Sequence, residues 1–344
     1  MVGIEEVAAL AGVSTATVSR ALRGKDHVSK KAQQKVEAAA KQLGYVASAS
    51  ASQLASGRTL NIGVVLPFID RWFFSVVLEG IETTLIEHGY DLTLYNLSGG
   101  PEQRKKVFNE FLMRKRVDGV LTIAVNPSEQ ELESLNRTGK PIIGIGGAIS
   151  GARALTIDDV AAGRLATEHL ISLGHSKVGF IGGIPGNDTE FNQPDLRELG
   201  YVAALEAAGL QLRDNWIAQA NYTIDGAYRA AKQMLGNPSH APTAIFCSSD
   251  EMGFGTIMAA KDLGLRVPQD ISVIGLDNHD MSEFFGLSTV SQSPRQQGCR
   301  AAEMMLKLLA DPNLSSHVNI EETTHWPVQL VVRSSTARSS TATR

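Results

Sequence analysis

The sequence predicts a small all-α head followed by a larger α/β body of two lobes with parallel sheets. Residues 1–60 carry apolar residues at helical spacing and no strand pattern. From Asn61 onward, short runs rich in Val and Ile alternate with amphipathic helical stretches, which is typical of parallel sheets covered on both faces. The strand-like runs fall into two successive sets, which indicates two similar lobes with a cleft between them.

The head is predicted to contain three helices. In IEEVAALAG the apolar residues share one helix face, and Gly12 suits a left-handed turn. Ser14 is placed to cap a second helix that runs to about Leu22, and Ser29 to cap a third, KKAQQKVEAAAKQL, that ends at Gly44. Two helices joined by a tight glycine turn and braced by a third form a helix-turn-helix arrangement.

The strands of the body are predicted from eight apolar runs. The first set is NIGVVLP, YDLTLYNL, DGVLTIAV and KPIIGIGG, and the second is KVGFIGG, WIAQANY, TAIFCSS and ISVIGLDN. Helical stretches such as FFSVVLEGIETTLIEHG and DEMGFGTIMAAKDLG lie between them. Because ligands of such sheets bind beyond the carboxyl ends of the strands, we expect the cleft at those ends.

The expected segments are a helix-turn-helix domain (1–46), a linker (47–59), the two-lobed body (60–333) and a flexible tail (334–344). The first lobe is expected over about 60–159 and 293–321, and the second over about 160–290 and 322–333. The linker, ASASASQLASGRT, permits a short helix from about Ser48 to Ser56, which is marginal alone because helix nucleation is unfavourable.

Composition narrows the class of protein. With 344 residues, 43% of them hydrophobic, the chain can bury a sizeable core. No apolar run approaches a membrane span and no signal peptide is evident, so we expect a cytoplasmic protein. Two distant cysteines, Cys247 and Cys299, make no disulfide framework or cysteine metal site, and no cofactor is expected.

The charge is distributed unevenly along the chain. Residues 1–60 carry eight Lys and Arg against four Asp and Glu, a net +4, which leaves −8 for the remainder of a chain whose total is −4. A basic head on an acidic body indicates that the head alone meets a polyanion. An ordinary solvated charged face is the alternative, because +4 is modest.

Seven stretches in order resemble one family. They are VAALAGVSTATVSRAL, HVSKKAQQKVEAAAKQLGY, QLASGRT, LISLGHSKVGFIGG, RELGYVAALEAAGL, VPQDISVIGLDN and TVSQ. Together they resemble the lac-repressor/gal-repressor family of bacterial transcription regulators, from Ile4 to about Arg333. The resemblance implies a periplasmic-binding-protein-like body and a homodimer that binds double-stranded operator DNA, with no membrane partner. It also implies allosteric control by a small effector between the lobes, most often a sugar and sometimes a purine. We expect a repressor with a carbohydrate effector.

The resemblance assigns DNA-facing roles within the head. Thr15 and Ala16 take the main base-reading positions and Arg20 a further one, and an arginine can bond guanine at O6 and N7 together. The residues placed for phosphates are Thr17, Ser19, His27 and Ser29. Helix capping or a solvated face is the alternative for the hydroxyls.

The resemblance gives the linker a further role. Leu54 is expected to wedge between base steps in the minor groove, and packing against its own lobe is the alternative. Ala47 stands where the family often has a proline, so the entry to the linker is expected to be less rigid.

In the body, the resemblance places a set of polar and aromatic residues in the cleft. They are Asp70, Trp72, Phe73, Asp158, Arg197, Ser249, Asp277 and Gln292. An aromatic face suits the C–H side of a sugar ring, and carboxylate and guanidinium groups suit its hydroxyls. Among the alternatives, the two aromatic residues could be core, Asp158 and Asp250 could cap helices, and Arg197 could form a surface salt bridge.

Two other classes of protein compete with a regulator. The glycine-rich GIGGAISG and GFIGGIPGN lack the full G-x-G-x-x-G order, and no G-x-S-x-G, H-E-x-x-H or P-loop occurs, so we expect no enzyme and no catalytic residue. His279 and Asp280 could bind a metal, but a capped helix start is the simpler interpretation. A transported-solute-binding protein shares the two lobes, but the basic helical head has no use in that role.

Overall fold

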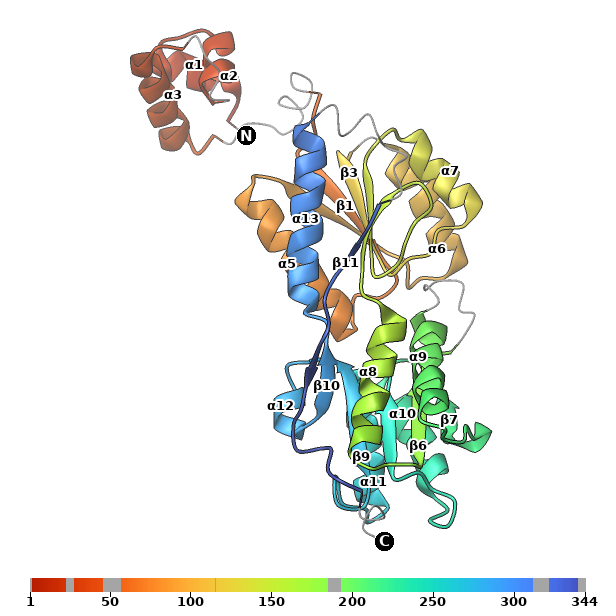
Figure 1. The fold of residues 1–344 in the computed structure, drawn as a ribbon. Coiled ribbons are helices and arrows are strands. Elements are labelled where there is room, and N and C mark those ends of the chain that lie inside the picture. Colours follow the sequence, from red (N-terminus) through yellow and green to blue (C-terminus); the bar gives the residue numbers. More distant parts are fainter. Residues whose placement is uncertain are drawn as a thin grey trace. The chain divides into compact units, whose positions relative to one another are not determined.

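A computed structural model of the chain describes residues 2–22, 28–45, 57–114, 116–184, 193–311 and 322–339, the side chains of 193–195 excepted. It divides into two units, Met1–Leu60 and Asn61–Arg344, which correspond to the predicted head and body (Figure 1).

The head consists of α1 (Ile4–Ala11), α2 (Thr15–Leu22) and α3 (Lys30–Leu43), as predicted. Gly12 ends α1 with φ 67° and Gly44 ends α3 with φ 61°, the left-handed conformation that favours glycine. Ser14 Oγ accepts from Thr17 N at 3.2 Å and Ser29 Oγ from Ala32 N at 3.3 Å, so both predicted caps are confirmed. The three helices share one core around three fully buried valines, Val7, Val18 and Val36.

The first lobe is a six-stranded parallel sheet in the order β11-β5-β4-β3-β1-β2. Its strands are β1 (Asn61–Leu66), β2 (Asp91–Asn96), β3 (Gly119–Ile123), β4 (Ile142–Ile145), β5 (Arg153–Thr156) and β11 (Glu322–His325). One face packs on α5 (Trp72–Glu87) and α13 (Pro294–Ala310). The other packs on the π-helix Val107–Phe111, the 3-10 helix Leu112–Arg114 and α7 (Glu129–Arg137).

The second lobe repeats this plan in the order β12-β10-β9-β8-β6-β7, with β12 antiparallel. Its strands are β6 (Val178–Gly182), β7 (Ile217–Gln219), β8 (Ala244–Cys247), β9 (Ser272–Asp277), β10 (Ser288–Ser291) and β12 (Gln329–Val331). The helices are α8 (Asp159–Ser172), α9 (Gln193–Ala207), α10 (Ile224–Leu235), α11 (Asp250–Asp262) and the short α12 (Ser282–Phe285), with a 3-10 turn at Asp214–Trp216. The fold class predicted from the sequence is therefore confirmed.

Two segments near the carboxyl end differ from the expectation. Strand β11 pairs with β5, so residues 322–325 lie in the first lobe rather than the second. The run ETTH has no apolar pattern and forms a mostly exposed edge strand, so its pairing left no signal in the sequence. The tail is also ordered over 334–339, because Ser335 Oγ donates to Val273 O at 2.5 Å and accepts from Ser288 N at 2.8 Å. Residues 340–344 lie outside the described residues.

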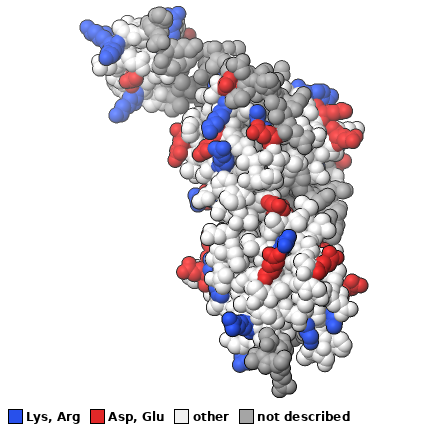
Figure 2. Space-filling model, in the orientation of Figure 1, with Lys and Arg blue, Asp and Glu red and all other residues white. Residues whose placement is uncertain are grey.

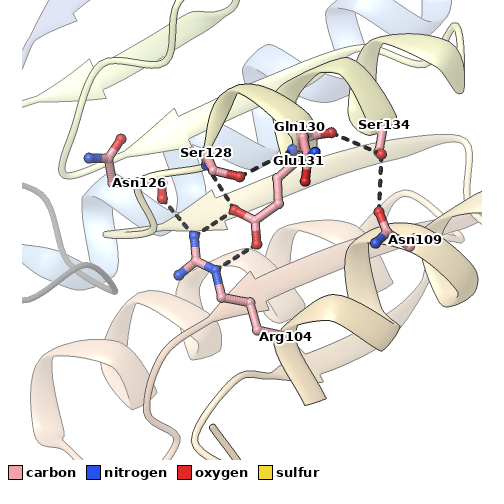
Figure 3. Close-up of polar contacts among 7 residues, drawn as sticks. All are labelled: Arg104, Asn109, Asn126, Ser128, Gln130, Glu131 and Ser134. Atoms are coloured by element: carbon pink, nitrogen blue, oxygen red, sulfur yellow. Dashed lines mark hydrogen bonds and ion pairs between the residues drawn. The ribbon is translucent and has the colours of Figure 1, made fainter. Parts of the chain in front are cut away.

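An ion pair ties α6 (Pro101–Lys106) to α7 in the first lobe (Figure 3). Arg104 donates from Nε and Nη2 to the two carboxylate oxygens of Glu131, each at 2.7 Å, and from Nη2 to Asn126 O at 2.6 Å. Glu131 also closes a capping box with Ser128 at the start of α7. Because both charged side chains are about 14% exposed or less, this bidentate pair is a structural clamp, and it lies outside the cleft lining described below.

Candidate functional site

The second helix of the head exposes the predicted base-reading residues. Val18 and Ala21 are buried against the other helices, which turns Thr15, Ala16 and Arg20 toward solvent. Helix α3 adds exposed lysines at four positions, Lys30, Lys31, Lys35 and Lys41. In Figure 2 the charged atoms seen on the head are mainly those of Lys and Arg. The head therefore carries a basic surface with an arginine on its exposed second helix.

The hydroxyl residues expected at phosphates have local partners. Thr17 Oγ1 shares a 2.9 Å hydrogen bond with Ser14 Oγ, and Ser29 Oγ caps α3, so of these two side chains only that of Ser29 acts as a helix cap in this structure. Ser19 is half-buried. His27 and Leu54, together with most of the linker, lie outside the described residues.

A pocket of about 630 Å³, counted out to its open mouth, lies between the two lobes. It is lined by Arg71, Phe73, Phe74, Ala124, Gly146, Ile157, Asp159, Arg197, Tyr222, Ser249, Glu251, Asp277 and Gln292. Most of these residues lie at or just beyond the carboxyl ends of strands or at the first turns of the helices that follow. The topology thus places the pocket where a parallel sheet leaves its loops free to hold a ligand.

Arg197 is held in the wall of the pocket by a buried ion pair. Its Nε donates to Asp159 Oδ1 at 2.7 Å and its Nη1 donates to Ser248 O at 2.6 Å. Burial would lower the pKa of Arg197, but Asp159, Tyr222 and Asp277 together outweigh it and raise that pKa. Burial also raises the pKa of Asp159, because the guanidinium does not fully offset the desolvation of the carboxylate. Arg197 is therefore a fixed cation, and its charge is already matched.

Asp277 ends β9 in a conformation that a side chain rarely adopts, with φ 129°, and Asn278 follows with φ 61°. Its Oδ1 accepts from Gln292 Nε2 at 2.5 Å. Burial raises the pKa of Asp277, and the negative charge of Asp250 adds to that rise, whereas Arg197 and the Gln292 hydrogen bond oppose it. The Asp277 carboxyl group therefore lies in the pocket wall with its pKa raised above the usual value.

Aromatic rings from both lobes reach the pocket. Phe73 and Phe74 stand at the start of α5, with ring centroids 5.5 Å apart and edge to face, and Tyr222 follows β7 in the second lobe. Rings on both sides of a cavity suit a flat or chair-shaped ring between them. Arg71 places its guanidinium 3.7 Å from the centroid of the Phe68 ring.

The structure brings five of the eight predicted cleft residues into this lining: Phe73, Arg197, Ser249, Asp277 and Gln292. Asp70 is exposed, and Asp158 caps α8 by accepting from Ala161 N at 2.9 Å. Trp72 bridges the lobes: its Nε1 donates to Asp280 Oδ2 at 3.1 Å and its ring stacks on His279 at 4.5 Å. These three side chains therefore lie outside the lining, and Asp158 and Trp72 have other partners in this structure.

The structure shows the surroundings of two residues for which helix capping or metal binding was considered, Asp250 and His279. Asp250 does not cap α11; Ser249 does, and the buried Asp250 carboxylate accepts from His279 N, Ser282 Oγ and Thr289 Oγ1. His279 Nδ1 accepts from Met281 N at 2.9 Å. Within the described part of the chain, no group of three or more His, Cys, Asp or Glu side chains could hold a metal ion.

The sequence reasoning missed eight lining residues: Arg71, Phe74, Ala124, Gly146, Ile157, Asp159, Tyr222 and Glu251. Ala124 and Gly146 directly follow β3 and β4, and Ile157 follows β5. The rule that ligands lie beyond strand ends could have found these three. Two of the missed residues, Asp159 and Arg71, are one residue away from predicted ones, Asp158 in the first case and Asp70 and Trp72 in the second. Which neighbour faces the pocket depends on where α8 and α5 begin.

The described helices were also checked for a membrane span, and none combines enough length with enough apolar character to cross a bilayer.

Comparison with known proteins defines the class. The model of bacterial regulatory proteins of the lacI family matches residues 3–48, and that of a periplasmic binding protein-like domain matches residues 167–336. HTH-type transcriptional repressors PurR are similar along most of the chain. That of Vibrio vulnificus (strain CMCP6) is 35% identical over 90% of this chain and 93% of its own length, and that of Serratia proteamaculans (strain 568) is 36% identical over 92% and 93%.

The chain is a DNA-binding transcriptional regulator with a helix-turn-helix head and a two-lobed body. It belongs to the lacI family of bacterial regulatory proteins, whose members that it matches here are repressors by name. A lac repressor dimer bound to operator and the anti-inducer ONPF is similar, with 27% identity, a TM-score of 0.82 and coverage of 98% of this chain and 99% of that one. A complex of the transcriptional regulator CelR with cellobiose has 26% identity, a TM-score of 0.70 and coverage of 97% and 100%.

Proposed function

We propose that this chain represses transcription by binding operator DNA as a homodimer, and that a small uncharged carbohydrate in the pocket between the lobes controls its operator affinity. The observation that carries the proposal is the combination, in one chain, of a basic helix-turn-helix head and a pocket lined by carboxylate, amide and aromatic side chains. A transported-solute-binding protein would need the pocket but not the head.

The exposed face of α2 supports sequence reading in the major groove. Arg20 presents a bidentate donor that can distinguish guanine, while Thr15 and Ala16 offer small surfaces for a thymine methyl. The lysines of α3 add attraction for phosphates. One such head makes too few contacts for a useful specificity, which is why we propose that two heads read a near-palindromic site.

Exposed apolar side chains on the second lobe support the dimer. Phe284 is 81% exposed, and Met281 and Phe285 beside it are also exposed. Phe285 stacks at 4.5 Å on Phe254 of α11, whose neighbour one turn further on, Met258, is exposed as well. Large aromatic side chains in water cost free energy that a partner surface would recover, so we propose that this face contacts the second protomer.

The composition of the pocket supports an uncharged effector with several hydroxyls. Its carboxylates are Asp159, Glu251 and Asp277, and its two cations are Arg71 and Arg197. Arg197 is already paired with Asp159, and Arg71 lies close enough to Glu251 to oppose the rise in the pKa of that carboxyl, so a phosphorylated ligand would meet no cation in this lining without a carboxylate beside it. Hydroxyl groups can donate to the carboxylates while the rings of Phe73 and Tyr222 cover the faces of a sugar.

A planar heterocycle such as a purine base is the second candidate effector. The aromatic side chains from the two lobes favour it, because they could sandwich a flat ring as well as a sugar. The carboxylates would then accept from ring N–H or amino groups.

We propose that effector binding closes the lobes and changes the spacing of the paired first lobes, so that linker helices near Leu54 separate and lose their order. Ordering them again costs free energy, and operator affinity falls accordingly. Leu54→Ala should then weaken operator binding and leave effector affinity unchanged. An unchanged operator affinity would remove the linker from the mechanism.

The DNA part is tested by selecting duplexes from a random pool with the full chain and then measuring affinity for the enriched sequence. We expect an inverted repeat, and Arg20→Ala should weaken its binding by about 10- to 100-fold while relaxing the preference at one base pair per half-site. Gln34→Ala, an exposed change on α3, serves as the matched control. Equal affinity for the selected and the random duplex would overturn the proposal.

The effector part is tested by thermal shift with monosaccharides, disaccharides, their phosphates and purine bases, followed by operator binding with each hit. We expect a neutral sugar to raise the Tm and to change operator affinity. Stabilisation by a purine base alone would select the second candidate, and turnover of any compound would revive the enzyme class. A fragment that begins at Leu60 should keep effector binding and lose operator binding.

A further inference from the structure

A line of buried amides leads from the pocket into the first lobe. Gln292, in the crossover after β10, donates from Nε2 to Asp277 Oδ1 at 2.5 Å. Gln297, in the first turns of α13, donates from Nε2 to Gln292 O at 2.7 Å and to Gln292 Oε1 at 3.2 Å. The three residues are 6% (Asp277), 3% (Gln292) and 0% (Gln297) exposed, so water does not compete freely for these bonds.

The orientation of both amides follows from one backbone carbonyl. Gln292 O can only accept, so the Gln297 atom that faces it must be the nitrogen Nε2. The same nitrogen faces the Gln292 side chain, which must therefore turn its own oxygen toward it. The Gln292 nitrogen is then left to face Asp277. A reversed Gln292 amide would place an NH2 group against the donor of Gln297.

Gln297 is held in place by the first lobe. The next residue, Gly298, packs so closely on α5 that an added Cβ would lie 2.1 Å from Val77 O, and Gly80 of α5 is as close to Arg295 O. Because α13 packs directly on the backbone of α5, the Gln297 amide is held in place against the first lobe. The line of buried amides therefore connects α13 of the first lobe to Asp277, a pocket residue at the end of a strand of the second lobe.

The oxygen of the Gln297 amide indicates that packing alone does not account for a glutamine at this position. Its Oε1 is buried and has no hydrogen-bond partner among the described residues. An apolar side chain of similar size would fill the site without leaving an acceptor unpaired. The donor must then be what makes glutamine the suitable residue at this position.

We propose that Gln297 is a positioning residue of the pocket, whose side-chain amide fixes the Gln292 amide so that Asp277 always faces an N–H and remains a hydrogen-bond acceptor toward the effector. The proposal rests on the proposed function in that the pocket holds an effector. It deepens that function by requiring the effector to present a hydroxyl or N–H donor at Asp277.

The charged groups around Asp277 determine how strongly its protonation depends on the Gln292 N–H. Asp250 and Glu251 on α11 disfavour its carboxylate, as does burial, and Arg197 on α9 favours it. The Gln292 N–H is the remaining favourable group. If Gln292 were free to turn, its oxygen could accept from a protonated Asp277, and the pocket would present a donor in place of an acceptor.

The test is the titration of the Asp277 carboxyl carbon by 13C NMR in the full chain labelled at aspartate Cγ, assigned with Asp277→Asn. Gln297→Met removes the donor at similar volume and should raise the apparent pKa of Asp277 by about one unit, the effect of one lost charge-assisted hydrogen bond. Gln296→Met, at the exposed neighbouring position, should leave it unchanged. Equal Asp277 titrations in the wild type and Gln297→Met would overturn the proposal.

A measurement on the wild type covers the case in which Gln297→Met does not fold. The side-chain NH2 protons of Gln292 should exchange with solvent far more slowly than those of exposed Gln296. Comparable exchange rates would mean that the Gln292 amide turns freely, and the proposal would fail. Neither measurement needs an effector, so a chain that binds no sugar or purine would contradict the proposed function while leaving this result intact.

Discussion

At the scale of single residues, the pocket is governed by buried charge. Arg197 and Asp159 are matched in a pair that is 8% and 7% exposed, and neither charge could be left alone without a large desolvation penalty. The pair therefore sets the shape of the pocket wall before any ligand arrives. Asp277, by contrast, is held by an amide and has capacity left for a ligand.

Replacement of Arg197 by alanine tests this view. The change leaves Asp159 buried without its partner, so we expect the free energy of unfolding to fall by about 3–5 kcal/mol at pH 7. The loss should be smaller at pH 5, because protonation of Asp159, whose pKa burial already raises, relieves the unpaired charge. Urea unfolding at both pH values measures it.

The control for that change is Arg229→Ala. Arg229 pairs with Asp225 at 2.7 Å, but the two side chains are 75% and 69% exposed, so the stability should hardly change. A similar loss in both variants would mean that burial of the Arg197 pair is not what makes it important.

At the scale of elements, close helix crossings stabilise each lobe, and residues 335–337 further stabilise the second. α5 crosses α13 at Gly80 and Gly298, and α8 crosses α9 at Gly163 and Gly200, where an added Cβ would lie 2.1–2.3 Å from the backbone of the facing helix. The tail contributes in a different way, because residues 335–337 bond to the start of β9 and to a buried histidine.

Gly298→Ala is expected to destabilise the first lobe. The new methyl group would overlap Val77 O, so α13 must move away from α5, at a cost of about 1–3 kcal/mol. Chemical denaturation measures the change, and Gln296→Ala on the exposed side of the same helix is the control. An unchanged midpoint for Gly298→Ala would show that the two helices have room to separate.

The tail contact predicts a pH dependence of stability. His175 Nε2 lies 3.0 Å from Ala337 O and Nδ1 lies 3.0 Å from Thr243 Oγ1. Burial lowers the pKa of His175, with the Ala337 carbonyl opposing, so below pH 6.5 the unfolded chain binds the proton more readily and stability falls as the pH drops.

We therefore expect the Tm to decrease by about 2 °C between pH 7.5 and pH 5.5 through this group. His175→Gln keeps a donor for Ala337 but cannot titrate, so it should flatten the profile, whereas His240→Gln, at an exposed position, should not. Parallel profiles for His175→Gln and the wild type would rule out this assignment.

At the scale of the whole molecule, the chain joins a DNA-reading unit to a sensing unit. The two units have separate cores, and under the proposed function signalling between them uses the linker and the pairing of protomers. Phe284 of α12, at 81% exposure, is the most exposed of the large hydrophobic side chains in the described part of the body.

Phe284→Asp tests the dimer. A charge at this 81% exposed position should leave the fold intact and convert the dimer to a monomer, with a loss of operator affinity of at least about tenfold because two half-sites are no longer read together. Sedimentation velocity and operator binding measure the two effects. Leu199→Asp, a similar change on α9 at 56% exposure, should do neither. A dimeric Phe284→Asp variant would place the protomer contact elsewhere.

The sequence by itself determined the order of the elements and the class of protein. Capping serines, glycine turns and apolar runs are local signals, so they predicted α1, α2, α3 and the two sets of mostly parallel strands, whereas the lacI family membership was predicted by the resemblance of seven stretches to that family. It also indicated Asp277 and Arg197 as cleft residues, because each stands in a stretch that the family resemblance covers.

Only the tertiary structure decided which side chains meet. Asp158 and Asp159 are chemically identical neighbours, and the start of α8 makes the first a cap and the second the partner of Arg197. β11 pairs with β5, which lies far from it in the chain, and Trp72 reaches His279 and Asp280 across the two lobes. Such pairings depend on contacts between distant segments, and the periodicity of a single segment contains no record of them.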